Sequence, residues 1–304
     1  MSGGVERDAG QRVRSLAELL RQDLAGAARR LFDHEAGVRL GEDPEAVHQA
    51  RVGIRRLRST LRTFQPVLDR QWSDALRAEL AWIAELLGKV RDQDVLLERL
   101  RHDLAALPRA GDDQAAGERL LRGLEQRRDR DRAVLLEAMD SPRYLALRER
   151  VAQALAAPAL LPAAAGSALE VGPALVARRW RRLRGEVAAA GSEPSDEQLH
   201  RIRIEAKRCR YAAEAVGPVA GEPAKAFARA VAALQEVLGE QHDAVVAQTW
   251  LREAVSSPGP RVRRAEAFVA GQLVAAEHAR AAAARAAWRE VWDQAAAKRL
   301  RRWL

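Results

Sequence analysis

Hydrophobic positions recur along almost the whole chain with the 3.6-residue period of an amphipathic α-helix, and no stretch shows the alternation expected of a strand. In the first half this period predicts four helices, over about residues 13–31, 43–66, 72–103 and 114–156. Asp43 is the expected N-cap of the second helix, with Pro44 in its first turn, where the missing N–H costs nothing. Ser141 and Pro142 mark a candidate break within the fourth helix.

The pattern then restarts after residues 157–173, a segment rich in Pro, Gly and Ala that we interpret as a connection. The second half again predicts four helices, over residues 174–191, from Ser195 onwards, over 224–251 and over 261–303. Ser195 with Gln198 three residues later forms a capping box for the second of these helices. Both halves therefore predict the same series.

The two series also match residue by residue. His48, Arg51, Arg55, Arg56, Arg58 and Pro66 recur 152 positions later as His200, Arg203, Lys207, Arg208, Arg210 and Pro218. The caps Asp43 and Ser195 keep that offset, and the third-helix stretches LLGKVRDQDV (86–95) and VLGEQHDAVV (237–246) match at an offset of 151. Such shared spacing indicates a tandem repeat. We therefore predict an all-α fold of two tandem, pseudo-twofold-related four-helix bundles, a single domain over residues 12–304 with repeats at 12–156 and 174–304.

Composition and charge narrow the picture. Hydrophobic residues make up 48% of the chain but aromatic residues only 4%, which favours helices. The formal net charge of +9 indicates a polyanionic partner. Cys209 is the only cysteine, so no internal disulfide forms and a reducing compartment is expected. Because no apolar signal core and no run of transmembrane length is present, we expect a cytoplasmic protein without membrane contact.

The second predicted helix of each half carries a stripe of cations. At about 100° per residue, one face gathers Ala50, Ile54, Leu57, Leu61 and Phe64, and another gathers His48, Arg51, Arg55, Arg58 and Arg62 within about 80° of arc. The second copy has His200, Arg203, Lys207 and Arg210, with Tyr211 beside them and Glu214 in the place of Arg62. Like charges at this spacing repel by about 0.2–0.5 kcal/mol per pair. Two uncompensated stripes therefore favour a bound anion over a solvated helix face.

The residue types on the stripes favour phosphate. Arginine forks match pairs of phosphate oxygens, and lysine adds a point charge. Tyr211 is the only ring available for stacking, and no Asn or Gln stands at a base-reading position, so a bare phosphate chain fits better than a nucleic acid. A nucleic acid, bound non-specifically at low salt, is the main alternative. An enzyme acting on polyphosphate is a third, but no acidic cluster is present to hold its metal, so we expect no metal, cofactor or catalytic residue.

The same residues resemble a known family. The helices VHQARVGIRRLRSTLRTF (47–64) and LHRIRIEAKRCRYAAEA (199–215), each followed by its third-helix stretch, are similar to the signature helices of the CHAD domain, the conserved histidine α-helical domain. The resemblance runs from about Arg12 to the C-terminus. It implies non-catalytic binding of inorganic polyphosphate through a basic surface, in association with polyphosphate granules and other granule proteins. Carried over by position, the contacts are His48, Arg51, Arg55, Arg56, Arg58, Arg62, His200, Arg203, Lys207, Arg208 and Arg210.

Other residues are expected to support the stripes. Asp92 and Asp243, equivalent in the third helices, are expected to fix the rotamers of the motif cations, the alternative being ordinary surface ion pairs worth about 0–1 kcal/mol. Arg91 and His242 each add a cation, and the arginines of RRWRRLR (178–184) widen the basic surface. Each motif histidine is expected to become charged near its reference pKa of about 6.5 and to bind phosphate more tightly in mild acid.

Overall fold

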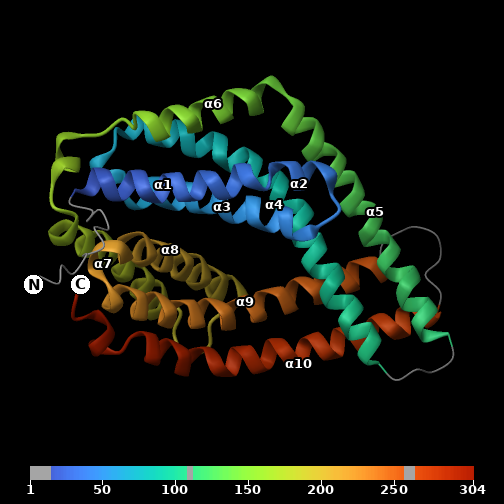
Figure 1. Cartoon of the computed structure of the whole chain (residues 1–304). Coiled ribbons are helices and arrows are strands. Elements are labelled where there is room, and N and C mark those ends of the chain that lie inside the picture. Colours follow the sequence, from blue (N-terminus) through green and yellow to red (C-terminus); the bar gives the residue numbers. More distant parts are fainter. Residues whose placement is uncertain (1–14, 108–111, 257–263) are drawn as a thin grey trace, which may run out of the picture.

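The chain is helical throughout the part that this computed structural model describes, residues 15–107, 112–256 and 264–304 (Figure 1). The first half comprises α1 (Leu16–Asp33), α2 (Glu35–Leu40), α3 (Pro44–Thr63), α4 (Arg70–Ala106), α5 (Asp113–Asp140) and α6 (Pro142–Ala156). The second half comprises α7 (Ala168–Ala189), α8 (Asp196–Ala220), α9 (Glu222–Ser256) and α10 (Arg264–Ala295). These residues contain two isolated β-bridges but no strand, which confirms the all-α prediction. None of the described helices has both the length and the apolar character needed to cross a membrane.

Capping residues decide where several helices begin. The Ser141 hydroxyl accepts a hydrogen bond from the N–H of Tyr144 at 3.3 Å, so α5 ends and α6 begins at the candidate break. The expected connection 157–173 is wrong in its later part, because α7 begins at Ala168. There the Ser167 hydroxyl accepts a hydrogen bond from the N–H of Glu170 at 3.3 Å and caps the helix. Gly172 and Pro173, two of the residues that suggested a connection, therefore lie inside α7.

The last helix is shorter than predicted. α10 ends at Ala295 instead of continuing to Trp303, and a 3₁₀ turn, η3 (Lys298–Arg301), follows it. The Arg301 guanidinium donates to the Ala296 carbonyl oxygen at 2.8 Å, which satisfies a group that the end of the helix leaves free. The predicted starting positions Arg12, Val13 and Arg261 lie outside the described residues.

The two halves meet along their motif helices. In the first half α3 packs against both α1 and α4, and in the second half α8 packs against both α7 and α9. The contact between α3 and α8 joins the halves, and one buried hydrophobic cluster extends through both of them, from Leu16 in α1 to Trp292 in α10. The motif helices are therefore the central pair of the molecule, and their cationic faces are held in a fixed relation to each other.

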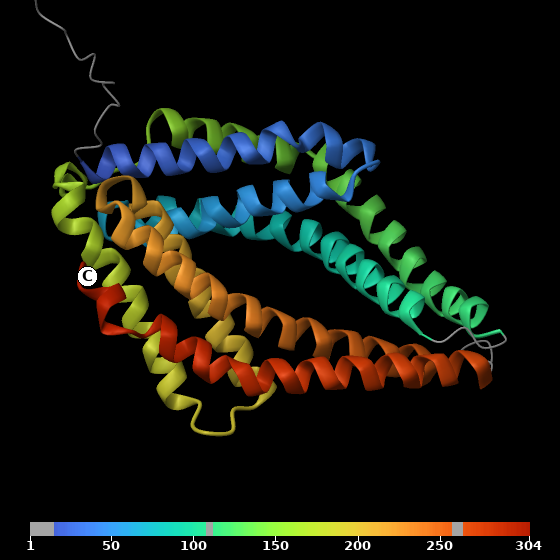
Figure 2. The ribbon, with the colours of Figure 1, turned by 60° about the horizontal axis from the view of Figure 1, so that its bottom comes forward.

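The halves touch again at the far ends of the long helices. Figure 2 shows α4 and α5 extending until they reach the ends of α9 and α10. A second hydrophobic cluster forms there, in which Leu100, Leu121, Leu251 and Leu273 are fully buried. The space between the halves is thus bounded by the α3–α8 contact on one side and by this cluster on the other.

An ion network strengthens this second contact. Arg99 of α4 donates two hydrogen bonds to Glu277 of α10, at 2.6 and 2.7 Å, and further bonds to Glu240 of α9, at 2.6 and 3.1 Å. Glu277 is fully buried, and it also accepts from Arg280 at 3.0 Å. Removing one partner of a buried pair typically costs about 3–5 kcal/mol, because the other charge is left unpaired. The network therefore ties α4 to both α9 and α10.

The equivalence between the halves extends to their first helices. Ser15 caps α1 in a capping box with Glu18, and Ser167 caps α7 through the N–H of Glu170, so both helices have glutamate at the third position. The two serines are separated by the same offset, 152, as the motif histidines. They also face each other in an isolated antiparallel bridge. Residues of α1 and α7 can therefore be compared position by position, as those of α3 and α8 can.

Candidate functional site

The cations of the two motif helices line a single groove between the halves. Its volume is about 490 Å³, and its walls are α3 and α4 on one side and α8 and α9 on the other. The lining residues are His48, Arg51, Val52, Arg55, Arg91, Asp92, Val95, Leu96, Arg99, His200, Arg203, Ile204, Lys207, His242, Asp243 and Val246. Two stripes that lie far apart in the sequence thus form one site.

Most of the lining residues are equivalent pairs from the two halves. The pairs are His48 and His200, Arg51 and Arg203, Arg55 and Lys207, Arg91 and His242, Asp92 and Asp243, and Val95 and Val246. A pseudo-twofold axis passing through the groove would produce this pairing. A ligand in the groove is therefore met by similar chemistry from both sides.

Each central arginine of the groove lies beside the aspartate of the following helix. Arg51 Nη1 donates to Asp92 Oδ1 at 2.8 Å, whereas Arg203 Nη2 lies 3.8 Å from Asp243 Oδ1. The pairing expected of the two aspartates is therefore present, and it is closer in the first half. Because each carboxylate contacts one edge of its guanidinium, the remaining N–H groups stay available to a ligand.

Two glycines lie beside these arginines, although a methyl group would fit at either position in ordinary van der Waals contact. A Cβ atom on Gly88 would lie 3.8 Å from Arg51 Nε, and one on Gly239 would lie 3.6 Å from Arg203 Nε. The guanidinium groups therefore lie along side-chain-free surfaces of α4 and α9. The repeat could have drawn attention to both glycines, because they occupy the same place in the repeated third-helix stretch.

Two other cations of the groove lack a carboxylate partner. Within the described part of the chain Lys207 and Arg55 form no ion pair, and Arg55 Nε is buried without a hydrogen-bond partner. Burial, followed by the charges of Arg203 and Arg55, lowers the pKa of Lys207 to about 7. Burial also lowers the pKa of Arg55, whose guanidinium carbon lies 5.4 Å from the centre of the Tyr211 ring. The free protein therefore holds positive charge here at an electrostatic cost.

In the free protein the pKa of each motif histidine lies below its ordinary value, so charging near pH 6.5 is not favoured without a ligand, and the gain of charge on binding phosphate stays a prediction. Burial, followed by the charge of Arg91, lowers the pKa of His48, and burial, followed by Arg203, lowers that of His200. For His242 burial lowers the pKa to about 4. The Nδ1 atoms of His200 and His242 are 3.2 Å apart, so one ring donates and the other accepts.

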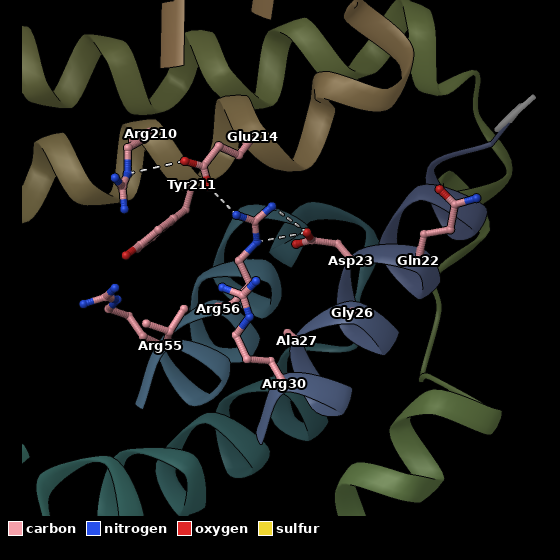
Figure 3. A pocket seen from close by; sticks show the side chains of 11 residues that line it. Gln22, Asp23, Gly26, Ala27, Arg30, Arg55, Arg56, Arg210, Tyr211 and Glu214 are labelled. Carbon is pink, nitrogen blue, oxygen red and sulfur yellow. Dashed lines mark hydrogen bonds and ion pairs between the residues drawn. The ribbon is translucent and has the colours of Figure 1, made fainter. Parts of the chain in front are cut away.

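The predicted stripes do not continue along the groove beyond Arg55. Arg56 is held between Asp23, at 2.9 Å, and Glu214, in a neighbouring pocket of about 430 Å³ between α1, α3 and α8 (Figure 3). Arg210 and Tyr211, also predicted for the site, line this pocket instead of the groove. A helical wheel describes one helix at a time, whereas the packing of α8 against α3 divides the cationic face.

The last predicted cations lie at a third place. Arg58, Arg62 and Arg208 lie close to one another and to Arg77. Burial is the largest cause that lowers the pKa of Arg62, and the charges of Arg208, Arg77 and Arg58 lower it further. None of the three lines the groove. The site residues predicted from the sequence are therefore divided among the groove, the pocket of Figure 3 and this arginine cluster.

The arrangement in the groove is that of a binding site for an anion. Its cations are Arg51, Arg55, Arg91, Arg203 and Lys207, against the carboxylates of Asp92 and Asp243, whereas Arg99, which also lines it, is paired with Glu240 and Glu277. Its apolar lining consists of aliphatic side chains, and the only rings that line it are imidazoles. Among the described residues, no three His, Cys, Asp or Glu side chains form a group that could hold a metal ion.

Comparison with known sequences identifies relatives of the chain. A sequence model of the CHAD domain matches residues 22–252. "Uncharacterized protein Rv2226" and "Uncharacterized protein MT2285", from two strains of Mycobacterium tuberculosis, are each 34% identical over 214 residues. These alignments cover 68% of this chain but 40% of each relative, so the chain spans less than half the length of the curated relatives it matches.

Comparison with solved structures gives the same family. PptA from Streptomyces chartreusis is similar with a TM-score of 0.76 and 29% identity, over 92% of this chain and all of that chain. The CHAD domain from the plant Ricinus communis is similar with a TM-score of 0.72 and 29% identity, over 96% of this chain and 97% of that chain. The likeness therefore includes both halves of the fold.

Replacing the buried lysine tests whether the groove carries uncompensated charge. Lys207→Met should raise the free energy of unfolding at pH 7 by about 1–3 kcal/mol, since each unit by which burial lowers a pKa corresponds to about 1.4 kcal/mol. The folded pKa of about 7 lies below the unfolded value, so the gain is largest below pH 7 and disappears as the pH approaches about 10. Urea denaturation measures the effect.

Lys89→Met is the matched control, because Lys89 is half exposed and pairs with Glu85 at 3.3 Å. Its stability should change by less than about 0.5 kcal/mol. An unchanged or lower stability of the Lys207→Met variant at pH 7 would show that Lys207 is not held in the groove at an electrostatic cost.

Proposed function

This chain belongs to the CHAD domain family, and from that premise we propose that it binds inorganic polyphosphate, without catalysis, in the groove between α3, α4, α8 and α9. The proposed contacts are His48, Arg51, Arg55, His200, Arg203 and Lys207. The observation that carries the proposal is the convergence of both motif helices on one groove in which the half-buried cations Arg55 and Lys207 have no carboxylate partner among the described residues. We further propose that the protein associates with polyphosphate granules in the cytoplasm, together with other granule proteins.

The geometry of the cations supports phosphate as the ligand. Arg51 and Arg203 approach from opposite walls with free N–H groups, and guanidinium forks bind phosphate oxygens in pairs. Lys207 and Arg55 lie close enough to both arginines to feel their charges, and neither forms an ion pair among the described residues. A phosphate chain brings negative charge to each of these positions and offsets the cost of burying them. The histidines that line the groove add hydrogen-bond donors.

The same lining favours a phosphate polymer without bases. Proteins that bind single-stranded nucleic acids stack the bases on aromatic side chains, worth about 1–3 kcal/mol per base. The groove presents Val52, Val95 and Val246 where such rings would be needed. General binding of nucleic-acid backbones remains the alternative function, supported by the net charge of +9.

Isothermal titration with long-chain polyphosphate at about 150 mM salt, where exposed charges are screened, tests the proposal. Arg51→Ala/Arg203→Ala should weaken binding about a hundredfold or more, because each charge-assisted bond contributes about 1.5–3 kcal/mol. Arg122→Ala/Arg127→Ala is the control of equal charge, since both arginines are exposed on α5 and neither lines the groove. Duplex DNA is titrated in parallel. Equal losses in the two double variants, or tighter binding of DNA than of polyphosphate, would contradict the proposal.

The affinity should also depend on pH through Lys207. A bound phosphate raises the pKa of this lysine above its free value of about 7, so above pH 7 binding takes up a proton. Between pH 7 and 9 the affinity for polyphosphate should therefore fall by up to about tenfold per pH unit. The Lys207→Met variant should lose this slope, which also controls for ionisation of the polymer. A slope that persists in that variant would assign the pH dependence to another group.

A further inference from the structure

A cluster of arginines lies outside the groove, between α3, α4 and α7. It surrounds a pocket of about 190 Å³ lined by Arg62, Gln65, Arg77, Arg178, Arg179 and Arg182, which we name the flank pocket. Arg58 and Arg208 stand close to it. The nearby carboxylates already have partners, because Asp74 accepts from Arg77 at 2.8 Å and Glu205 accepts from Arg208.

The other arginines of the flank pocket are not paired with carboxylates. Within the described residues, Arg62, Arg178, Arg179 and Arg182 form no ion pair. Arg179 is only 6% exposed, and its Nη2 donates to the carbonyl oxygen of Arg62 at 2.6 Å. Burial, followed by neighbouring arginines, lowers the pKa of both Arg62 and Arg179 to about 10. Both guanidinium groups remain charged at neutral pH, and the charge of Glu205, which partly offsets that of Arg179, is the one carboxylate charge of the described residues that acts on either of them.

The equivalent pocket of the other half contains carboxylates. This is the pocket of Figure 3, where Arg56 lies between Asp23 and Glu214. Glu214 also lies 3.5 Å from Arg210. Arg56 and Arg210 therefore have carboxylate partners within that pocket, whereas Arg30 and Arg55, which also line it, form no ion pair among the described residues.

The offset of 152 shows how the two pockets differ. Asp23 corresponds to Leu175, Glu214 to Arg62, Gly26 to Arg178, Ala27 to Arg179, and Arg30 to Arg182. The pocket of Figure 3 thus combines arginines with the carboxylates of Asp23 and Glu214. At the two positions that match these carboxylates the chain has Leu175 and Arg62 instead. Packing alone explains neither the loss of both carboxylates nor the added arginines, since like charges in one pocket repel.

We propose that the flank pocket is a second anion site, separate from the groove, that binds a compact inorganic phosphate oligomer. Guanidinium groups from three helices converge on a space less than half the volume of the groove, which suits a short chain of phosphoryl groups. Such a chain is either a free short phosphate or the end of a longer polymer. The site exists in one half only, so the two flanks of the molecule bind phosphate unequally.

The test uses the full chain carrying Arg51→Ala/Arg203→Ala, which removes the central cations of the groove. Isothermal titration with tripolyphosphate at about 150 mM salt should still give one binding event per chain. Adding Arg178→Ala/Arg182→Ala should weaken this event about a hundredfold, at about tenfold or more per arginine. Both side chains are exposed, so their removal leaves the core intact.

Arg181→Ala/Arg184→Ala is the matched control in the same background. These arginines lie on the same helix, are also exposed and remove the same charge, but they do not line the flank pocket. Their removal should change the affinity by less than about threefold. Equal weakening by the two pairs, or no tripolyphosphate binding before either pair is removed, would overturn the proposal. Neither result depends on whether polyphosphate occupies the groove, so the two proposals fail independently.

A titration of the chain with an intact groove distinguishes the two sources of the ligand. If Arg178→Ala/Arg182→Ala weakens the binding of long-chain polyphosphate, the polymer itself reaches the flank pocket. If it weakens only tripolyphosphate binding, the pocket takes free short phosphates.

Discussion

Positive charge held between two helical halves without enough carboxylates is the constraint on which the rest of the structure depends. Lys207 and Arg55 lie in the groove without ion pairs, and the burial that lowers their pKa values also raises the energy of the free protein. A chain that only had to fold would place methionine or leucine there. The arrangement becomes favourable when an anion occupies the groove, and the phosphate polymer that we propose as ligand carries a negative charge on each unit.

The fold offsets this repulsion at a distance from the groove. The buried network of Arg99, Glu240 and Glu277 and the hydrophobic cluster around Leu100 hold α4 against α9 and α10. The contact between α3 and α8 holds the other side. These two contacts hold the halves apart in the free protein, so the cations do not have to be brought together on binding. Rigid placement of charges in this way is how an anion site is preorganised.

The helical series and the repeat could be predicted from the sequence because both rest on local patterns. The 3.6-residue period, the caps at Asp43 and Ser195 and the offset of 152 are legible without tertiary information. The extent of the site could not be predicted from such patterns. A helical wheel places Arg58 and Arg62 on one stripe with His48, but the packing of α8 against α3 separates these two arginines from the groove. The lowered pKa values of the motif histidines were missed because burial, their largest cause, depends on packing, and because the charge of Arg91 reaches His48 from the neighbouring helix α4.

The central claim is that one polyphosphate chain lies in the groove and contacts both halves at once. A crystal structure of the chain with bound polyphosphate tests it most directly. Phosphate oxygens are expected within about 2.7–3.2 Å of Arg51 and Arg203 in the same molecule, with a further oxygen near Lys207. Phosphate bound only on the outer surface of the helices, with the groove holding none, would contradict it.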